Sequence, residues 1–544
     1  MTPSAAILCA GPVPIEIAAL FRCSSIGLIP LNGRPLIAWQ LDYLSKIGIE
    51  TVRIGIRKSD RRLADYLETY RRLFQASIEI IQIEDDRGPG GTLLQTVSAE
   101  DAAGGTLVLL GDTLLEPETI LELSEGSRIF TSEVDDVQRW CMVDSDPETG
   151  EVLSLTDKPK SSPSENARAA IGCYWLQGVE EQTWQKLQDI KEKKIELSTI
   201  LRSIGEAHGL REEALENWLD CGNADLLVTT RRRMIAARAF NSLAIDDLRG
   251  TVKKRSQHSE KFRHEINYYR LLPPDLAIYF PRLVSYETAE PEAFVELEYY
   301  AYPTMSEIYI YEEYSDSFWT GVFAKLSKIM GEFRSRTVAL NPQTCSGFYS
   351  GKLDQRLETA RNSGGEIASL LASENVKVNG KSLRGISNLL PDLHSELEKI
   401  SQTVKASVIH GDLCFANILL EPLNKMIRLI DPRGSFAEVG VFGDPRYDAA
   451  KLWHSVDGHY DAIINDLFSI SGSGNELEFE SFQPRCRDQV MELLTTIIPE
   501  EDDVRTIRLI EGSLFLSMIP LHSDRPLRQK AMLASGLKIL NEEL

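Results

Sequence analysis

The sequence predicts an α/β protein in two parts: a doubly wound, mainly parallel sheet first, then a bilobal α+β domain. In the first part, short apolar runs of strand length alternate with amphipathic helical patterns, which is typical of a parallel sheet covered by helices. In the second part, a few strands and one helix precede a long helical region, and 544 residues are too many for one hydrophobic core. We therefore expect domains at residues 1–236 and 237–544, the second divided into a small lobe (237–303) and a helical lobe (304–544).

The strands expected in the first domain are short and rich in aliphatic residues. They are AAILCAG (5–11), TVRIGI (51–56), SIEIIQI (77–83) and TLVLLGD (106–112). PLIAWQLDYLSKIGI (35–49) has apolar residues at helical spacing and a glycine near its end, which predicts a helix. The basic stretch ADLLVTTRRRMIAARA (224–239) predicts the helix that closes the domain.

The second domain begins with a different pattern. FNSLAIDDLRGTVKKRS (240–256) predicts two strands joined at a turn, and EKFRHEINYYRLL (260–272) predicts a helix. PRLVSYE (281–287) and AFVELEYY (293–300) predict further strands. After Pro303 the pattern is largely helical, so we expect a small sheet with one helix followed by a helical lobe.

The composition, 43% hydrophobic and 26% charged, is that of an ordinary globular protein. No apolar run reaches the roughly 18 residues of a membrane span, and the start lacks the basic region of a signal peptide, so we expect no membrane insertion. The net charge of −22 argues against nucleic acid as a partner. Eight scattered cysteines without a C-x-x-C pair argue against a disulfide framework or a zinc site and fit the cytoplasm.

The strongest pattern of the second domain is H-G-D-x-x-x-x-N at residues 410–417, in which the D is Asp412 and the N is Asn417. Asp431 follows it, beyond a predicted hairpin. Phosphoryl transfer from a magnesium nucleotide needs a carboxylate that orients the attacking hydroxyl and takes its proton, and oxygen ligands for the metal. Magnesium prefers hard oxygen ligands. The pattern therefore predicts Asp412 as the catalytic base and Asn417 with Asp431 as Mg²⁺ ligands.

This pattern resembles the aminoglycoside phosphotransferase and choline kinase family, over residues 238 to 544. The resemblance implies a protein-kinase-like fold and ATP-dependent phosphorylation of a small molecule. GDPRYDAAKL (443–452) matches a further family segment, which implies that Asp448 braces the catalytic loop. The family also uses a strand lysine to hold nucleotide phosphates and a helix glutamate to fix that lysine.

Either Lys253 or Lys254 could be the strand lysine. We favour Lys254, because it shares a strand face with Val252, which suits a contact with the nucleotide base. Glu265, in the predicted helix, is its expected partner; the alternative for Glu265 is a solvated helix face. No glycine-rich loop precedes the strand, so the turn at residues 246–250 is expected to cover the phosphates.

Two look-alikes are set aside. GFYSGK (347–352) is one residue too short for a Walker A loop and lacks the hydroxyl residue after the lysine. His454 could be taken for a catalytic base, but it follows Trp453 on a predicted helix, where a packed histidine is expected.

A series of segments in the first domain follows the motif order of one known family. They are LCAG (8–11), IPLNGRPLIAWQLDYL (29–44), GPGGTLLQ (88–95), LVLLGDT (107–113), RWCMV (139–143), LTDKPK (155–160), IGCYWL (171–176) and WLDCGN (218–223). They resemble the sugar-1-phosphate and phosphocholine nucleotidyltransferases of the pyrophosphorylase superfamily. The resemblance implies that nucleotide is bound at Gly11, Gly90 and Gly91, that Lys158 contacts the substrate phosphate, and that Asp112 and Asp220 bind metal.

This assignment agrees with the chemistry, because the reaction joins two anions that repel each other. A magnesium ion held by Asp112 and Asp220 could bridge them, while Lys158 neutralises the phosphate. Glycines at 90 and 91 let a base or phosphate approach the backbone closely.

One segment departs from the family. GPVPIEIAALFRCSSIGLIP (11–30) lacks the G-T-R of active members, and Ile26 stands where the signature lysine is expected. Arg22 and Arg34 are the candidates to replace the missing cations.

We therefore expect a bifunctional enzyme with Mg²⁺ as cofactor and ATP and a second NTP as substrates. Its kinase would phosphorylate a small molecule, and its nucleotidyltransferase would make an NDP-activated precursor for cell-surface polysaccharide such as capsule. The alternatives are a kinase with a non-catalytic nucleotide- or sugar-phosphate-binding domain, and a scaffold whose sites have both decayed. The sequence leaves open the acceptor (choline, ethanolamine, a polyol or a sugar), the second NTP and the oligomeric state, for which a homo-oligomer is one possibility. The aromatic segment 311–323 would suit either a binding site for a quaternary amine or the hydrophobic core.

Overall fold

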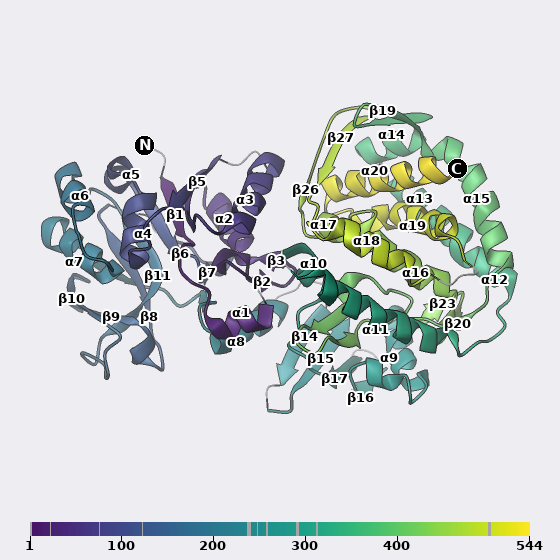
Figure 1. Cartoon of the computed structure of the whole chain (residues 1–544), viewed down its shortest axis with the longest axis horizontal. Helices are drawn as coiled ribbons and strands as arrows, with labels where there is room; N and C mark the ends of the chain where they lie inside the picture. The colour runs from purple at the N-terminus through teal and green to yellow at the C-terminus, as the bar shows by residue number, and fades with distance from the viewer. Residues whose placement is uncertain are drawn as a thin grey trace. The chain divides into compact units, whose positions relative to one another are not determined.

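The computed structural model describes residues 3–21, 23–74, 77–121, 123, 125–236, 241–246, 248–256, 259–289, 293–311, 314–498 and 502–544. The chain divides into two compact units, Met1–Arg233 and Met234–Leu544 (Figure 1). Each unit has its own group of buried apolar side chains and is described by itself. Whether the expected domains, 1–236 and 237–544, fold independently stays a prediction.

The first unit is built on a nine-stranded sheet with the order β10-β9-β11-β6-β1-β4-β5, in which β8 pairs with β11 and β12. Its strands are β1 Ser4–Leu8, β4 Thr51–Arg57, β5 Ser77–Ile83, β6 Thr106–Leu110, β8 Arg128–Ser132, β9 Cys141–Ser145, β10 Val152–Asp157, β11 Arg168–Leu176 and β12 Arg211–Ala214. Strands β6, β1, β4 and β5 are parallel, as the alternation of strands and helices predicts. Strand β11 runs antiparallel to β6, β8 and β9, which that alternation does not predict.

Helices cover this sheet. They are α1 Ile15–Phe21, α2 Leu36–Lys46, α3 Arg61–Phe74, α4 Gly88–Thr96, α5 Ala99–Gly104, α6 Glu181–Gln188, α7 Leu197–His208 and α8 Ala224–Ala236. Buried leucines of α4 and isoleucines of α7 join β1 and β6 in one apolar core. Helix α5 begins with a capping box, in which Ser98 Oγ accepts the N–H of Asp101 and the Asp101 carboxylate accepts the N–H of Ser98.

Short elements complete the first unit. They are the turn η1 Ile26–Leu28, the pair β2 Pro30–Leu31 and β3 Arg34–Pro35, and the pair β7 Thr113–Leu115 and β13 Trp218–Asp220. In the second pair, antiparallel pairing sets Thr113 opposite Asp220. Strand β7 begins just after β6 ends, so residues 112 and 220 meet near the carboxyl end of a central strand, where doubly wound sheets bind ligands.

The second unit opens with an antiparallel sheet of order β14-β15-β17-β16. Its strands are β14 Asn241–Asp246, β15 Thr251–Ser256, β16 Leu283–Glu287 and β17 Phe294–Glu298. Helix α9, Ser259–Leu271, packs on this sheet through Phe262 and Ile266, which contact Val295 and Leu297. A small sheet with one helix is the arrangement that the sequence predicts for this part.

The rest of the second unit is largely helical. Its helices are α10 Met305–Tyr311, α11 Asp316–Arg334, α12 Pro342–Ser346, the π-helical turn η4 Gly347–Gly351, α13 Lys352–Asn362, α14 Gly365–Ala372, α15 Ile386–Gln402, α16 Pro445–Val456, α17 Tyr460–Ile464, α18 Arg487–Thr495, α19 Val504–Met518 and α20 Pro526–Glu543. A sheet that the sequence analysis did not predict joins β18 Asn375–Val378, β19 Lys381–Arg384, β26 Phe468–Ser471 and β27 Glu476–Ser481. Two strand pairs flank the candidate catalytic loop: β20 Ser407–Val408 with β25 Phe442–Gly443, and β21 Ile418–Glu421 with β22 Met426–Leu429.

Three smaller expectations concern this unit and the chain. Residues 347–352 form the π-helical turn and the start of α13, not a loop around phosphate. His454 is fully buried between the rings of Tyr460 and Phe515. Within the described ranges, no helix is long and apolar enough to cross a membrane, and all eight cysteines are free thiols.

Candidate active sites

The loop from His410 to Asn417 connects β20 to the hairpin β21–β22. The backbone N–H of Ile430 donates to Asn417 O at 3.0 Å, so the hairpin returns the chain beside the loop. The N–H of Arg433 donates to His410 O at 3.0 Å. Residues 412, 417 and 431, which the sequence analysis selected, therefore come together at one end of the hairpin.

The Asp412 carboxylate lies between two side chains. Its Oδ1 is 2.9 Å from Lys451 Nζ, and its Oδ2 accepts a hydrogen bond from Asn417 Nδ2 at 3.3 Å. Burial alone would raise the pKa of Asp412, but the Lys451 ammonium outweighs it and holds that pKa below its ordinary value. Asp412 is therefore ionised at neutral pH and, with 42% of its side chain exposed, can accept a hydrogen bond from a hydroxyl group.

His410 and Asp448 fix the shape of this loop. Burial lowers the pKa of His410 to about 4, so the ring is neutral; its Nε2 pairs with Ile430 O at 2.9 Å, and its Nδ1 accepts the N–H of Asp412 at 3.2 Å. The buried Asp448 carboxylate accepts the N–H of His410 at 2.7 Å and that of Gly411 at 2.8 Å. Gly411 has a φ of +79°, which glycine adopts without strain. The brace that the resemblance implies for Asp448 corresponds to these two hydrogen bonds.

Lys254 reaches this loop from the small sheet. Its Nζ lies 2.8 and 3.0 Å from the carboxylate oxygens of Glu265 on α9, and 3.0 Å from Asp431 Oδ1. Burial would lower the pKa of Lys254, but the two carboxylates raise it above its ordinary value, so the ammonium stays charged. Glu265 is 7% exposed and so does not lie on a solvated helix face. Lys253 instead places its Nζ 4.2 Å from the centre of the Phe294 ring.

Gly434 explains why the loop after Asp431 can lie against α9. Its φ is +68°, and a Cβ atom there would collide with the backbone carbonyl of His264. A side chain at this position would therefore push the loop away from the helix that carries Glu265.

The residues at this end of the hairpin suit a magnesium ion. The Asp431 carboxylate is 51% exposed, and Asn417 uses its amide nitrogen to bond Asp412, which leaves the amide oxygen for a ligand. Among the described residues, no group of three or more His, Cys, Asp and Glu side chains gathers to hold a metal. Magnesium is commonly held by one or two protein oxygens together with phosphates and water, so a two-residue donor set fits.

The first unit also holds a pair of carboxylates, Asp112 and Asp220. Their positions adjoin across the β7–β13 pair, and the N–H of Cys221 donates to Asp112 O at 2.9 Å. Burial, and then the charge of Asp112, raises the pKa of Asp220 to about 7; burial also raises the pKa of Asp112. Two buried carboxylates disfavour each other's charge, and a divalent cation would relieve this, so the pair fits magnesium.

Gln40 of α2 holds the turn that carries Asp112. Its amide nitrogen donates to Leu110 O and to Thr113 O, each at 2.8 Å. Ile26 is buried beside the same turn, and a Cβ atom at Gly111 would lie 2.7 Å from Ile26 Cγ2. An apolar side chain therefore packs where the family signature has a cation.

Of the two candidates for the missing cation, the structure describes only Arg34, whose guanidinium is engaged by other side chains. Arg34 donates to Asp42 at 2.5 Å, and its guanidinium lies 5.0 Å from the centre of the Trp39 ring. Arg22 lies outside the described residues.

The predicted nucleotide-binding glycines lie in different surroundings. Gly11 is exposed, with open space where a Cβ would be. Gly90 and Gly91 are buried in α4: a Cβ at Gly90 would lie 2.8 Å from Ile195 O, and one at Gly91 would lie 2.5 Å from Arg87 Cβ. The close approach at these two glycines is thus made by the protein's own chain.

Lys158, the predicted phosphate contact, is exposed and has a φ of +46°. Its N–H donates to Trp140 O at 2.8 Å, and the Trp140 ring meets that of Trp218 edge-on at 5.3 Å. Since Trp218 begins the strand that ends in Asp220, this contact ties the segment of Lys158 to the strand of the carboxylate pair.

Sequence reasoning missed Lys451, the ion-pair partner of Asp412. A signal was available, because Lys451 follows Asp448 by one helical turn and so shares its face of α16. It also missed Lys352 and Arg433, which lie with Tyr447 near Asp412.

Residues 26–148 match the MobA-like NTP transferase domain family. The bifunctional sugar-1-phosphate nucleotidylyltransferase/acetyltransferase of Sulfurisphaera tokodaii is 24% identical to this chain over 199 residues. The match covers 36% of this chain and 46% of that protein, so the chain spans less than half the length of this relative. A solved structure of a UDP-glucose pyrophosphorylase with UDP-glucose is 19% identical, with a TM-score of 0.37, and the match covers 44% of this chain and 100% of that one. A UDP-glucose pyrophosphorylase from Acinetobacter baumanii is 18% identical, with a TM-score of 0.36, and the match covers 43% of this chain and 94% of that one. The family match confirms the nucleotidyltransferase-like fold of the first unit. The protein-kinase-like fold of the second unit stays a prediction.

Proposed function

We propose that the second unit is an ATP-dependent kinase that phosphorylates a hydroxyl group of a small molecule. The observation that carries the proposal is the meeting of Lys254, Glu265 and Asp431 with the loop of Asp412 and Asn417. This set holds the charged groups that phosphoryl transfer requires: a fixed cation, an ionised carboxylate and oxygen ligands for a metal.

In the proposed reaction, Asp412 orients the acceptor hydroxyl and takes its proton. The acceptor oxygen bonds to the γ-phosphorus of ATP as the bond to the bridging oxygen breaks, and ADP leaves. Lys254, held by Glu265, contacts the nucleotide phosphates. Asp431 and Asn417 would hold Mg²⁺, which neutralises charge on the β- and γ-phosphates.

The kinase is tested by Asp431→Ala in the full chain, with Asp220→Ala in the background to weaken nucleotide binding by the first unit. We expect the affinity for Mg–ATP, measured by calorimetry, to fall at least about tenfold, because a metal ligand is lost. Asp488→Ala, at a 96% exposed position, is the control and should leave the affinity unchanged. An affinity that is the same in all three proteins would refute the metal-binding role of Asp431.

For the first unit, we propose nucleotidyl transfer to the kinase product, with the family match and the Asp112–Asp220 pair as support. A phosphate oxygen of the product attacks the α-phosphorus of an NTP, and pyrophosphate leaves. Lys158 neutralises the incoming phosphate, and the two aspartates would hold Mg²⁺, which would supply positive charge that offsets the repulsion between the anions. The Sulfurisphaera relative is named for sugar-1-phosphate, so this is the first acceptor class to try. Such a product would serve as an activated precursor for cell-surface polysaccharide.

The transfer is tested by mixing full-length protein with sugar 1-phosphates and each NTP in turn and measuring pyrophosphate. Asp220→Ala should stop pyrophosphate release, and in a second mixture that starts from the kinase acceptor, ATP and the second NTP it should leave the kinase product to accumulate. Asp225→Ala is the control, because Asp225 lies close to Asp220 in the sequence and its side chain is 62% exposed. This variant should behave like the unaltered protein.

A kinase with a binding-only first unit is the second candidate. Buried Ile26 and the ion pair of Arg34 favour it, because the signature position carries an apolar side chain and the guanidinium of Arg34 is paired with Asp42. If no NTP yields pyrophosphate with sugar phosphates or with the kinase product, while the kinase is active, this second candidate is correct.

A further inference from the structure

Four cations from three elements form a series of neighbours that begins at Asp412, and we call them the basic cluster: Lys451 of α16, Arg433 of the loop after Asp431, and Lys352 and Arg356 of α13. Lys352 and Arg356 are four residues apart, so they share one face of α13. The charges of Arg433 and Lys451 act on Lys352, and that of Arg433 acts on Arg356. The cluster thus adjoins the candidate catalytic carboxylate through Lys451.

Aromatic rings, not carboxylates, hold the outer part of this cluster. Lys352 Nζ lies 5.0 Å from the centre of the Phe348 ring and 5.9 Å from that of Tyr447. Arg433 places its guanidinium carbon 5.0 Å from the same Phe348 ring and donates to Tyr447 Oη at 3.1 Å. The Phe348 ring therefore makes cation–π contacts with both Lys352 and Arg433, which fix the positions of these cations without neutralising their charges.

The positive charge of the cluster is only partly balanced. Lys451 pairs with Asp412, whereas no carboxylate among the described residues lies within ion-pair distance of Lys352, Arg356 or Arg433. Burial, together with the neighbouring cations, lowers the pKa of Lys352 to about 8, and the cations outweigh burial to lower the pKa of Tyr447. Like charges held this close disfavour one another, so an anion placed among them would be bound strongly.

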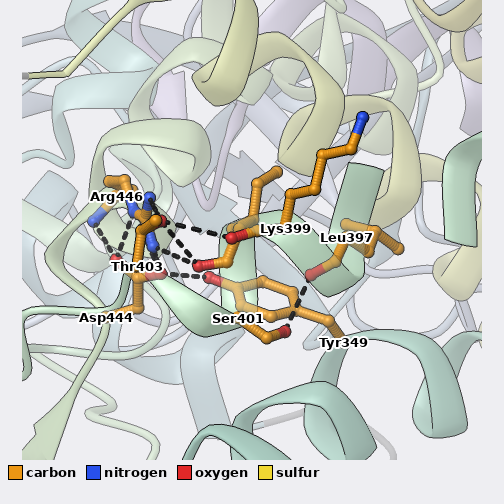
Figure 2. A network of polar contacts seen from close by, with 8 residues as sticks. Tyr349, Leu397, Lys399, Ser401, Thr403, Asp444 and Arg446 are labelled. Atoms are coloured by element: carbon orange, nitrogen blue, oxygen red, sulfur yellow. Dashed lines mark hydrogen bonds and ion pairs between the residues drawn. The ribbon is translucent and has the colours of Figure 1, made fainter. Parts of the chain in front are cut away.

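A buried polar network behind the cluster explains why it keeps its shape (Figure 2). Asp444 caps α16, accepts the phenol hydrogen of Tyr349 at 2.9 Å and binds Arg446 Nη2 at 2.8 Å. The same guanidinium donates to Ile400 O and to Thr403 Oγ1 at the end of α15. The network joins the turn that carries Phe348 to the helix that carries Tyr447 and Lys451. Asp444 is fully buried and paired with Arg446, so it does not neutralise the cluster.

We propose that the basic cluster is an acceptor subsite that binds a carboxylate or phosphate group of the molecule whose hydroxyl Asp412 addresses. The inference rests on the proposed kinase function, in which Lys254, Asp431 and Asn417 serve the nucleotide. Lys352 and Arg356 remain for the acceptor. An acceptor of this class is an anionic hydroxy compound, such as a sugar acid or a sugar phosphate. Choline and ethanolamine would be repelled. The aromatic segment that suited a quaternary amine is core instead, since its described rings are buried: Tyr311, Tyr314, Phe318, Trp319 and Phe323.

The first test uses matched acceptors with ATP: glucose, glucuronate and glucose 6-phosphate, then glycerol, glycerate and glycerol phosphate, with choline and ethanolamine as cations. We expect kcat/KM to be at least about tenfold higher for an anionic member than for its neutral parent. The carboxylate and phosphate arms show which anion the site prefers. Preference for a neutral or cationic acceptor would overturn the subsite while leaving the kinase intact.

The second test separates acceptor binding from folding and from nucleotide binding. Lys352→Ala and Arg356→Ala should raise KM for the anionic acceptor about 10–100-fold, the range for loss of one charge-assisted hydrogen bond, and leave KM for ATP unchanged. Lys352→Arg should retain most of the affinity. Arg361→Ala, an exposed position on another face of α13, is the matched control. Equal KM values in Lys352→Ala and Arg361→Ala would refute the subsite.

A third measurement needs no identified acceptor. Sulfate is titrated into the full chain saturated with Mg²⁺ and a non-hydrolysable ATP analogue, and its affinity is compared among the same variants. We expect weaker sulfate binding in Lys352→Ala and Arg356→Ala but not in Arg361→Ala; identical curves would count against the subsite. Failure of the kinase itself has a different signature, namely no Mg–ATP binding and no ADP release with any acceptor, and it would overturn both proposals.

Discussion

At the scale of single residues, the prediction concerns the charge on Asp412. Asp412→Asn keeps the shape of the side chain and an oxygen for Asn417, but it removes the proton acceptor and the partner of Lys451. We expect phosphoryl transfer, measured as acceptor-dependent ADP release, to fall by about 10²–10⁴, the range for loss of a general base. Calorimetry should show Mg–ATP affinity largely retained, in contrast to Asp431→Ala. Normal turnover in Asp412→Asn would show that another group takes the proton.

Some residues of the site could be selected from sequence because one short segment carries them. The spacing of Asp412 and Asn417 fits one loop, and strand alternation favoured Lys254, which the structure pairs with Glu265. The basic cluster could not be found in this way, because its members come from three elements and meet only through packing. The same holds for Ile26, whose packing against Gly111 is a tertiary contact between distant segments.

At the scale of elements, helix α16 is predicted to stabilise the catalytic loop through Asp448. In Asp448→Asn, an amide nitrogen faces a buried backbone N–H of residue 410 or 411, and one acceptor is lost. We expect the free energy of unfolding, from denaturant titration, to fall by about 1–3 kcal/mol, and kinase activity to fall with it. Asp488→Asn, an exposed control, should change stability by less than about 0.5 kcal/mol. Unchanged stability in Asp448→Asn would show that the loop holds its shape without the brace.

Elements made by local pattern were predictable, and those made by distant pairing were not. The parallel strands β1, β4, β5 and β6 and helices such as α2 and α9 follow from periodicity over a few residues. The sheet of β18, β19, β26 and β27 was missed because one of its pairings joins Lys377 to Glu476, which are distant in the sequence. The antiparallel position of β11 was missed for the same reason, since no local signal distinguishes it from a parallel strand.

At the scale of the whole molecule, the net charge does not predict the local charge of an individual binding site. The chain carries −22 overall, which argues against nucleic acid as a main partner but is compatible with a local group of cations such as the basic cluster. The first unit has the opposite arrangement, a buried pair of carboxylates without a described cation at the signature position. Both proposed sites would use Mg²⁺ and a lysine, Lys158 in the first unit and Lys254 in the second, and the basic cluster is the feature that distinguishes the second.

The last prediction is that the two parts function separately. Residues 1–236 and 238–544 should each melt in one cooperative transition when expressed alone, because each unit has its own apolar core. The C-terminal fragment should keep the kcat and KM of the full chain for ATP, because Lys254, Glu265, Asp412 and Asp431 all lie within it. The N-terminal fragment should release pyrophosphate from NTP and sugar phosphate if the first unit is a nucleotidyltransferase. A C-terminal fragment that is unfolded would mean that the second unit needs contacts with the first or that the boundary lies elsewhere. One that is folded but inactive would mean that the kinase requires residues before 238.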